Sequence, residues 1–249
     1  MKIISLNLAW TLFAGIGARR IITALKTMLG MQADIVFLQE VGSYRILSII
    51  KKGVTTEYQV LYRPHLLGPA GGLVILTKAT AYNIMLCSYF SKIKFGLLGG
   101  IFTVLIIDNI YGKQLSLTNV HLAPDHSGTW SRPGYINSKK KELSKIEQHI
   151  TEHEHAECSI IAGDFNAPPN SHLIQYIISN FDHVDAFDGK NIPTFNEKFL
   201  KSGMLAAKID HILIRSNTVS HICNRQIVFS DIDTKPFSDH GMLVVEIDH

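Results

Sequence analysis

Cysteine is scarce in this sequence. Its 249 residues include three cysteines, Cys87, Cys158 and Cys223, which are far apart. Because they show no paired spacing, the sequence predicts neither a disulfide framework nor a cysteine-rich metal site. This usage suits a reducing compartment, and we expect the protein to be cytoplasmic.

Long apolar runs are missing as well. The longest, over residues 95–107, is shorter than the roughly 20 residues that a membrane-spanning helix needs, and glycines interrupt it. Residues 1–18 have the lysine and the apolar stretch of a secretory signal, but Asn7 breaks that stretch. We therefore expect no transmembrane segment and favour an uncleaved N-terminus.

Charge of one sign is also limited. The formal net charge is +3, and twelve histidines can add positive charge below neutral pH. This balance suits a phosphate-bearing partner but is far from that of a dedicated nucleic-acid coat protein. Two basic clusters, Arg19-Arg20 and Lys139 to Lys141, are candidates for phosphate contacts, although we interpret each as the solvated face of a helix.

Apolar periodicity indicates a mixture of helices and strands. Helical spacing predicts helices over 19–29, 44–51, 138–154 and 172–179. Short apolar runs predict strands over 3–8, 33–41, 58–63, 72–76, 82–88, 101–107, 114–121, 158–163, 208–214, 220–229 and 242–247. We expect residues 180–203 to be irregular. Hairpins in both halves favour an α/β fold with two packed sheets, and no linker or repeat divides the single domain expected over residues 1–249.

The stretch from Cys158 to Pro169 joins a buried strand to a sharp turn. An apolar run leads to Gly163, and then Asp164, Asn166 and two prolines prevent the strand from continuing. Strand ends form ligand crevices in α/β proteins, so this carboxylate and this carboxamide are placed for chemistry. Taken alone, the stretch leaves open an Asx-rich turn with local side-chain bonds.

Polar residues stand at other strand ends too. Apolar strands stop at Asn7, Glu40, His121 and Asp210, and the pair Asp239-His240 precedes the last strand. Singly, each is explained by a rim residue, a helix cap or a structural histidine. Together with Asp164 and Asn166 they supply oxygen ligands for a magnesium-like ion and imidazoles that donate to a phosphate or exchange protons. The set predicts metal-assisted phosphoryl chemistry.

Seven short motifs follow one another along the chain. They are Leu6-Asn7, Leu38-Gln39-Glu40-Val41, Gly72 to Thr77, Asn119-Val120-His121-Leu122, Gly163-Asp164-Phe165-Asn166, Lys208 to Ile212 and Ser238-Asp239-His240. In this order they resemble the motifs of the endonuclease/exonuclease/phosphatase superfamily, which includes deoxyribonucleases, abasic-site endonucleases, tyrosyl-DNA phosphodiesterases, inositol polyphosphate phosphatases and neutral sphingomyelinases. The resemblance implies a four-layer α/β sandwich whose active site, at one edge of two facing sheets, hydrolyses phosphoester bonds.

The resemblance also implies a metal site. Glu40 would hold Mg²⁺, for which Mn²⁺ is a substitute, with Asn7 beside it. Asp239 would support the ion directly or through water. The ion would polarise a phosphoryl oxygen and steady the leaving group.

The resemblance also implies that the other motif residues act on the phosphate and on the attacking water. Asp164 would orient or deprotonate the water, while Asn166 fixes the phosphate. His240, held by Asp210, would act as a base or stabilise the charge that develops on phosphorus. The choice of base between Asp164 and His240 stays open. His121 would be a second imidazole at the phosphate, which resembles the deoxyribonuclease and sphingomyelinase branches.

Three hypotheses about the partner remain. We favour a phosphodiester of nucleic acid or a nucleotide, hydrolysed by in-line attack of water. The alternative is a lipid phosphodiesterase resembling neutral sphingomyelinase, in which residues 89–102 form a hairpin that dips into a membrane, although a buried hairpin is the simpler interpretation. The third is a catalytically inactive binding module, and the complete set of strand-end groups argues against it.

Four further residues refine these hypotheses. Ala9 stands where abasic-site endonucleases place an acid, which disfavours that branch. Phe195 is a candidate pocket aromatic, although loop aromatics more often fill the local core. His149 and His153 are spaced as metal ligands on a helix, but we interpret them as the solvent-facing end of a polar helix. We expect a monomer.

Overall fold

The computed structural model describes residues 1–9, 18–54, 56–92, 98–125, 130–188, 190, 192–195, 206–215, 221–230, 236 and 238–248. Residues 10–17 of the N-terminal apolar stretch, residues 93–97 of the apolar segment and the side chain of Cys87 lie outside this description. No helix of the described residues is long and apolar enough to cross a membrane.

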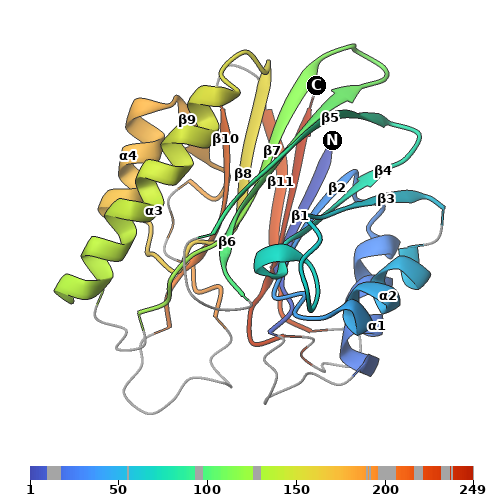
Figure 1. The fold of residues 1–249 in the computed structure, drawn as a ribbon, viewed down its shortest axis with the longest axis horizontal. Helices are drawn as coiled ribbons and strands as arrows, with labels where there is room; N and C mark the ends of the chain where they lie inside the picture. Colours follow the sequence, from blue (N-terminus) through green and yellow to red (C-terminus); the bar gives the residue numbers. More distant parts are fainter. Residues whose placement is uncertain are drawn as a thin grey trace.

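Two six-stranded sheets face each other (Figure 1). The first contains, in spatial order, β11 (His221–Val228), β12 (Met242–Asp248), β1 (Lys2–Asn7), β2 (Ile35–Gln39), β4 (Val74–Lys78) and β3 (Tyr58–Leu61). The second contains β5 (Tyr82–Ser91), β6 (Gly100–Asp108), β7 (Gln114–His121), β8 (Cys158–Asp164), β10 (Asp210–Arg215) and β9 (His183–Asp185). Both sheets are mixed, because β1 pairs with β2 and β7 pairs with β8 in parallel, whereas the other pairs are antiparallel.

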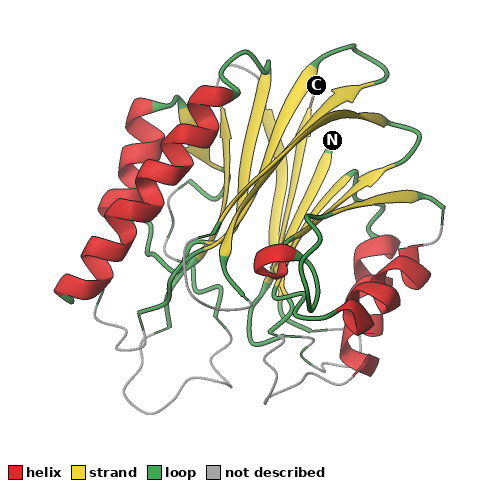
Figure 2. Ribbon diagram, viewed as in Figure 1, coloured by secondary structure: helices red, strands yellow, loops and turns green. Residues whose placement is uncertain are grey.

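Helices cover the two outer faces (Figure 2). The first sheet carries α1 (Ala18–Gly30) and α2 (Tyr44–Val54), and the second carries α3 (Pro133–Glu152) and α4 (His172–Asn180). A 3₁₀ turn, η1 (Ala70–Gly72), precedes β4. The order helix, sheet, sheet, helix confirms the four-layer α/β sandwich expected from the sequence.

Alternating side chains of the strands feed separate apolar cores. In β2, Leu38 packs with Leu25 and Leu47 of the first helical layer, whereas its neighbour Phe37 enters the layer between the sheets. This alternation follows from the two-residue repeat of a strand. A third core lies between the second sheet and its helices, and it contains Ile146 of α3. Every strand that carries a site residue is therefore fixed on both faces.

A buried polar clamp joins the sheets beneath the predicted site. Asn119 of β7 accepts a hydrogen bond from Gln39 Nε2 (2.8 Å) and donates from Nδ2 to the carbonyls of Leu38 and Val74 (both 2.9 Å). Both side chains are fully buried, and an unpaired amide there would cost about 1–3 kcal/mol. The clamp fixes β7 against β2. Gln39 directly precedes Glu40, and Asn119 lies two residues before His121, so the clamp also positions these two site residues.

The strand directions bring the motif residues to one edge. The carboxyl ends of β1 and β2 meet at Asn7 and Gln39, and those of β7 and β8 meet at His121 and Asp164. Asp210 is the first residue of β10 rather than the end of a strand, so that expectation was wrong. Since β10 is antiparallel to β8, with Asp210 opposite Asp164, its start lies at the same edge.

Some element boundaries differ from the prediction. Helix α3 begins at Pro133, five residues before the expected start, because proline is tolerated in the first helical turn, where its missing N–H is not needed. The segment expected to be irregular contains the short strand β9, which pairs with β10. The pairing is long-range, so no local pattern revealed it.

The interpretation of His149 and His153 as solvent-facing was wrong. Both are buried, at 3% and 4% exposure. His149 bonds through Nδ1 to Thr103 Oγ1 and through Nε2 to Ser91 Oγ, each at 2.7 Å, and His153 packs on the ring of Tyr89. These histidines connect the C-terminal end of α3 to β5 and β6, and the hydrogen bonds on both ring nitrogens of His149 argue against a zinc site.

Buried neutral histidines should make the fold sensitive to acid. Burial lowers the pKa of His149 and of His183 to about 4. An unfolded histidine titrates near 6.5, so between pH 6.5 and pH 4 the unfolded chain binds protons that the folded chain does not. The free energy of unfolding should fall over this window by about 3 kcal/mol for each histidine and level off below it, at about 1.4 kcal/mol per pKa unit.

Urea unfolding at pH 7.5 and pH 4.5 checks this prediction. His149→Gln and His183→Gln should each lose less stability on acidification than the wild-type protein. The exposed His155→Gln variant is the control and should follow the wild type. Acid sensitivity unchanged in both buried-site variants would contradict the assignment.

Candidate active site

Eight predicted site residues gather at one edge of the two sheets. The set consists of Asn7, Glu40, His121, Asp164, Asn166, Asp210, Asp239 and His240. Contacts of 4 Å or less connect them into one network, which runs from Glu40 through Asn7 and Asp164 to His240 and Asp210. The structure thus brings together residues separated by up to 233 positions, from Asn7 to His240.

Asn7 bridges the two central carboxylates. Its Nδ2 donates to Glu40 Oε1 (3.3 Å) and to Asp164 Oδ2 (3.1 Å), while its Oδ1 accepts from the backbone of Ala9 (2.8 Å). In this arrangement the amide nitrogen, not the oxygen, faces the carboxylates. Asn7 therefore holds Glu40 and Asp164 in place, and its expected part in the metal site stays a prediction.

Glu40 has the features of a cation ligand. It is mostly buried, and its Oε2 has no hydrogen-bond partner among the described residues. Burial raises the pKa of this carboxyl, although His121 and His240 counteract the increase. A carboxylate oxygen buried without a partner is costly unless a cation or a donor satisfies it, and carboxylates are preferred ligands of Mg²⁺. The carboxylate of Glu40 therefore fits a hard divalent ion.

A second cluster could also hold an ion by distance alone. Ligand atoms of Asp164, Asp210 and His240 all lie within 4.8 Å of one another. However, His240 Nδ1 already bonds to both oxygens of Asp210, at 2.9 and 3.1 Å, and such a carboxylate–imidazole pair is internally satisfied. This geometry is better suited to proton transfer than to binding a hard cation.

The backbone at Asp164 explains the Gly-Asp-Phe-Asn motif. Gly163 has φ +139°, and a Cβ there would lie 2.1 Å from the carbonyl oxygen of Val120, so only glycine fits. Asp164 Oδ1 accepts from the backbone N–H of Asn166 (2.9 Å), which has φ +47°. Asn166 Nδ2 donates to the carbonyl of Leu122 (3.0 Å). The motif is an Asx turn, and that turn also presents one carboxylate oxygen to the site.

Asp164 and His240 form an electrostatically coupled pair. Their Oδ2 and Nε2 atoms are 3.8 Å apart. Burial and the neighbouring Asp210 raise the pKa of Asp164, against the effect of His240 and His121. Burial lowers the pKa of His240, but Asp210 and Asp164 outweigh it and hold that pKa well above its usual range. The protonation of each group therefore depends on the charge of the other.

His121 lies close to both central carboxylates. Its Nε2 is 3.8 Å from Glu40 Oε1 and 3.7 Å from Asp164 Oδ2. Its Nδ1 is buried and has no hydrogen-bond partner among the described residues. A cavity of about 220 Å³ opens beside His121 and Glu40 and is lined further by Leu98, Gly99, Leu122, Ala123 and Pro124.

The Ser-Asp-His motif is attached directly to β1. Ser238 Oγ donates to the carbonyl of Asn7 (2.6 Å) and accepts from the N–H of His240 (3.1 Å). Asp239 keeps a side-chain exposure of 32% and lies 3.9 Å from His240 Nε2. Its position at the rim suits contact with an ion through water.

Thr194 is a supporting residue that the sequence did not reveal. Its Oγ1 accepts from the N–H groups of Ile209 and Asp210 (3.0 and 3.1 Å), and its carbonyl accepts from Gly241 (2.7 Å). It therefore fixes the backbone on both sides of the carboxylate–imidazole pair. The adjacent Phe195, a candidate from the sequence, contacts the ring of His240 edge to face at 5.2 Å between centroids.

Lys139 was interpreted as solvated, and that interpretation was wrong. It is 7% exposed, and its Nζ donates to the carbonyl of Phe165 (2.6 Å) and pairs with Glu142 (3.0 Å). Tyr135, one turn earlier in α3, donates from its hydroxyl to the carbonyl of Asn166 (2.8 Å). Two side chains of α3 thus hold the turn that carries Asp164 and Asn166. The sequence shows a basic cluster at Lys139 to Lys141, but the sequence pattern did not show which of these lysines is buried.

Residues 89–91 and 100–102 belong to the second sheet, at the end of β5 and the start of β6. Tyr89, Phe90 and Ser91 pair with Thr103, Phe102 and Ile101 in register. Ile101 and Phe102 are buried, and Phe90 packs against the core between the sheets. Membrane contact by this segment gains no support from the described residues and stays a hypothesis for residues 93–97.

Comparison with known proteins agrees with this geometry. The sequence profile of the "Endonuclease/Exonuclease/phosphatase family" matches residues 5–240. No protein with a curated function matches the sequence significantly.

Solved structures share the fold at low sequence identity. D. rerio TDP2, complexed with a single-strand DNA product, has a TM-score of 0.78 at 17% identity, covering 100% of this chain and 99% of that one. The human Nocturnin catalytic domain with bound sulfate gives 0.70 at 19%, covering 98% and 92%. The mannosyl-6-phosphatase of Bacteroides thetaiotaomicron gives 0.73 at 18%, covering 100% of each chain.

Proposed function

The chain belongs to the endonuclease/exonuclease/phosphatase family, and from this premise we propose that it is a Mg²⁺-dependent phosphodiesterase acting on nucleic acid or a nucleotide. The family hydrolyses phosphoester bonds with the help of a divalent metal ion. The observation that carries the proposal is the continuous network from Glu40, whose Oε2 has no hydrogen-bond partner in the described part of the chain, to the Asp210–His240 pair. It places an oxygen ligand for a cation and a proton-transfer pair at one edge of the sheets.

The metal is proposed to bind at Glu40, with Asp239 as support. When bound, Mg²⁺ supplies positive charge that polarises a phosphoryl oxygen and steadies the leaving group. Asn7 keeps Glu40 and Asp164 side by side through its two donated hydrogen bonds. A cation there would satisfy the buried oxygen of Glu40 that has no partner among the described residues.

The coupled pair is proposed to manage the proton of the attacking water. Asp210 fixes Nδ1 of His240, so Nε2 faces Asp164 and the reacting phosphate. Asp164 orients the water and accepts its proton, while the imidazolium of His240 stabilises negative charge on the phosphoryl oxygens. Asn166 and His121 hold the phosphate. All of these proposed roles belong to side chains at the shared edge of the two sheets.

A nucleic-acid or nucleotide substrate is supported by charge and by a structural neighbour. The formal charge of +3 favours a phosphate-bearing partner. The D. rerio TDP2 structure holds a single-strand DNA product on the same fold. Because a mannosyl-6-phosphatase also has this fold, the assay must include a phosphomonoester.

A substrate panel tests the proposed function. Hydrolysis is measured with EDTA and with about 5 mM Mg²⁺, a concentration chosen to saturate a typical weak Mg²⁺ site. The substrates are a single-stranded and a double-stranded DNA, an RNA, an aryl phosphodiester, an aryl phosphomonoester and sphingomyelin vesicles. We expect Mg²⁺-dependent cleavage of a nucleic acid or of the aryl diester. Cleavage of the vesicle lipid alone, or of the monoester alone, would refute the proposed substrate class.

Removing one charge at Glu40 should weaken the metal site. Glu40→Gln keeps the size of the side chain but loses the anionic oxygen, so the Mg²⁺ concentration for half-maximal activity should rise about 10-fold or more. A Mg²⁺ titration of the initial rate measures this, with the exposed Glu57→Gln variant as the control. An unchanged Mg²⁺ requirement would place the metal elsewhere.

A further inference from the structure

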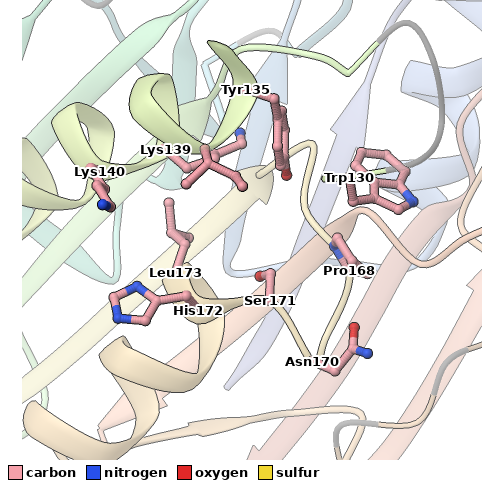
Figure 3. Close-up of a pocket in the computed structure, with 10 residues that line it drawn as sticks. Trp130, Tyr135, Lys139, Lys140, Pro168, Asn170, Ser171, His172 and Leu173 are labelled. Atoms are coloured by element: carbon pink, nitrogen blue, oxygen red, sulfur yellow. The ribbon is translucent and has the colours of Figure 1, made fainter. Parts of the chain in front are cut away.

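A second pocket adjoins the catalytic turn on its helical side. It has a volume of about 460 Å³ and lies between the start of α3 and the loop that leads into α4 (Figure 3). The lining consists of Trp130, Tyr135, Ile136, Lys139, Lys140, Pro168, Asn170, Ser171, His172 and Leu173. This volume falls within the range of about 300–1,000 Å³ that is usual for small-molecule sites. None of the eight site residues lines the pocket.

We propose that this pocket binds one nucleotide unit of the substrate, with the base at Trp130 and Tyr135 and a flanking phosphate at Lys140. This inference rests on the proposed function and narrows its substrate class to strands or nucleotides that carry a base beside the scissile bond.

One end of the pocket is aromatic. The rings of Trp130 and Tyr135 lie 5.8 Å apart between centroids at an angle of 65°, and Pro168 is beside them. Trp130 is half-buried, and its backbone has φ +58°, a conformation that Asp125 fixes by accepting from its N–H (2.6 Å). A large ring held in place yet partly open to solvent provides a stacking surface for a base.

The other end of the pocket is polar and basic. Figure 3 shows Lys140 and His172 on the side away from Trp130, with Leu173 between the two ends. Lys140 and His172 are both exposed, so their side chains can reach a phosphate without disturbing the core. An aromatic surface at one end and a cation at the other matches a base joined to a phosphate. A lipid chain would use the apolar end alone.

The pocket is built on the same turn as the active site. Tyr135 bonds to the carbonyl of Asn166 (2.8 Å), and Lys139, which bonds to the carbonyl of Phe165, lies 5.2 Å from the centre of the Tyr135 ring. Pro168 follows Asn166 by two residues, so their Cα atoms are at most about 7–8 Å apart. A base next to a phosphate held at Asn166 can therefore reach the aromatic end.

Binding can be measured without catalysis. The chain contains two tryptophans, so the Trp10→Phe variant leaves Trp130 as the sole tryptophan. In EDTA, its fluorescence is titrated with the dinucleotide d(ApA) and with deoxyribose 5-phosphate, which lacks a base. We expect saturable quenching by d(ApA) only, and a several-fold weaker response after Lys140→Gln. No saturable quenching, or an equal response to the abasic phosphate, would overturn the proposal.

A selectivity ratio tests the same pocket during turnover. We compare kcat/KM for the p-nitrophenyl ester of thymidine 5′-phosphate with kcat/KM for bis(p-nitrophenyl) phosphate, which has no base. Trp130→Ala should lower this ratio about 10-fold, mainly through KM, since stacking on one aromatic contributes about 1–3 kcal/mol. Trp130→Phe should restore part of it. The control Tyr111→Ala removes an exposed aromatic from the β6–β7 turn and should leave the ratio unchanged.

The two failures are distinguishable. If the wild-type protein hydrolyses neither diester in Mg²⁺, the proposed function fails, while the titration in EDTA still reports on the pocket. If both diesters are hydrolysed and Trp130→Ala lowers the two kcat/KM values equally, the pocket is not a base subsite and the proposed function stands.

Discussion

Replacing Asp164 by asparagine is expected to lower the rate of hydrolysis about 10³-fold while the protein stays folded. The amide has nearly the same shape as the carboxylate, but it cannot accept a proton from water, and loss of a general base typically costs about 10²–10⁴-fold. The oxygen that accepts from the N–H of Asn166 is kept, so the turn should persist. The effect should appear in kcat, measured on the best substrate of the panel at saturating Mg²⁺.

The same change should not reduce stability. Asp164 is buried beside Asp210, and that neighbour is one of the causes that raise its pKa. Asparagine removes this like-charge repulsion but also removes the acceptor of the hydrogen bond from Asn7, so these effects should offset each other and leave the urea midpoint near the wild-type value. The control is Asp108→Asn, a buried aspartate at the opposite end of the second sheet, where it caps a turn. Its activity should match the wild type. Near-normal turnover in Asp164→Asn would refute the role of Asp164.

Replacing Asp210 by asparagine should lower kcat by about 10²–10³-fold through the imidazole of His240. Both oxygens of Asp210 face Nδ1 of His240, so this carboxylate aims Nε2 at Asp164 and stabilises the positive charge of the ring. An asparagine at this position can donate to Nδ1 and stabilise the wrong tautomer, as in other carboxylate–imidazole pairs.

The Mg²⁺ requirement separates this effect from a metal effect. Asp210 bonds to His240, whereas Glu40 bonds to Asn7. Asp210→Asn should therefore lower kcat while the Mg²⁺ concentration for half-maximal activity stays near the wild-type value. Glu40→Gln should mainly raise the Mg²⁺ concentration for half-maximal activity and should affect kcat less. A shifted Mg²⁺ requirement in Asp210→Asn would instead support an ion within the cluster of Asp164, Asp210 and His240.

The sequence predicted the layers and the site for a local reason. Apolar runs mark strands, and polar residues at their ends mark an edge, because parallel neighbours such as β1 and β2 end together. Glu40, His121 and Asp164 could therefore be grouped by sequence pattern alone. Asp210 was grouped correctly for a reason that proved wrong, since it begins its strand and is brought to the edge by antiparallel pairing.

The supporting contacts could not be predicted because their partners are distant in the sequence. Asn119 and Gln39 are 80 residues apart, and Tyr135 meets Asn166 across 31 residues. His149 was interpreted as a surface residue because its helix is polar, yet its ring is buried and hydrogen-bonded to two hydroxyl groups of the second sheet. In each case the three-dimensional arrangement supplies a partner that makes burial of a polar side chain favourable.

The edge shared by the two sheets is proposed to be one metal-dependent site for hydrolysing phosphodiesters. Its most direct test is cleavage of a labelled single-stranded DNA by the wild-type protein in Mg²⁺, in EDTA, and in EDTA with excess Mg²⁺ restored, beside Asp164→Asn in Mg²⁺. We expect cleavage that stops with EDTA, returns with Mg²⁺ and is nearly absent in the variant. Cleavage that persists in EDTA, or that Asp164→Asn retains, would contradict it.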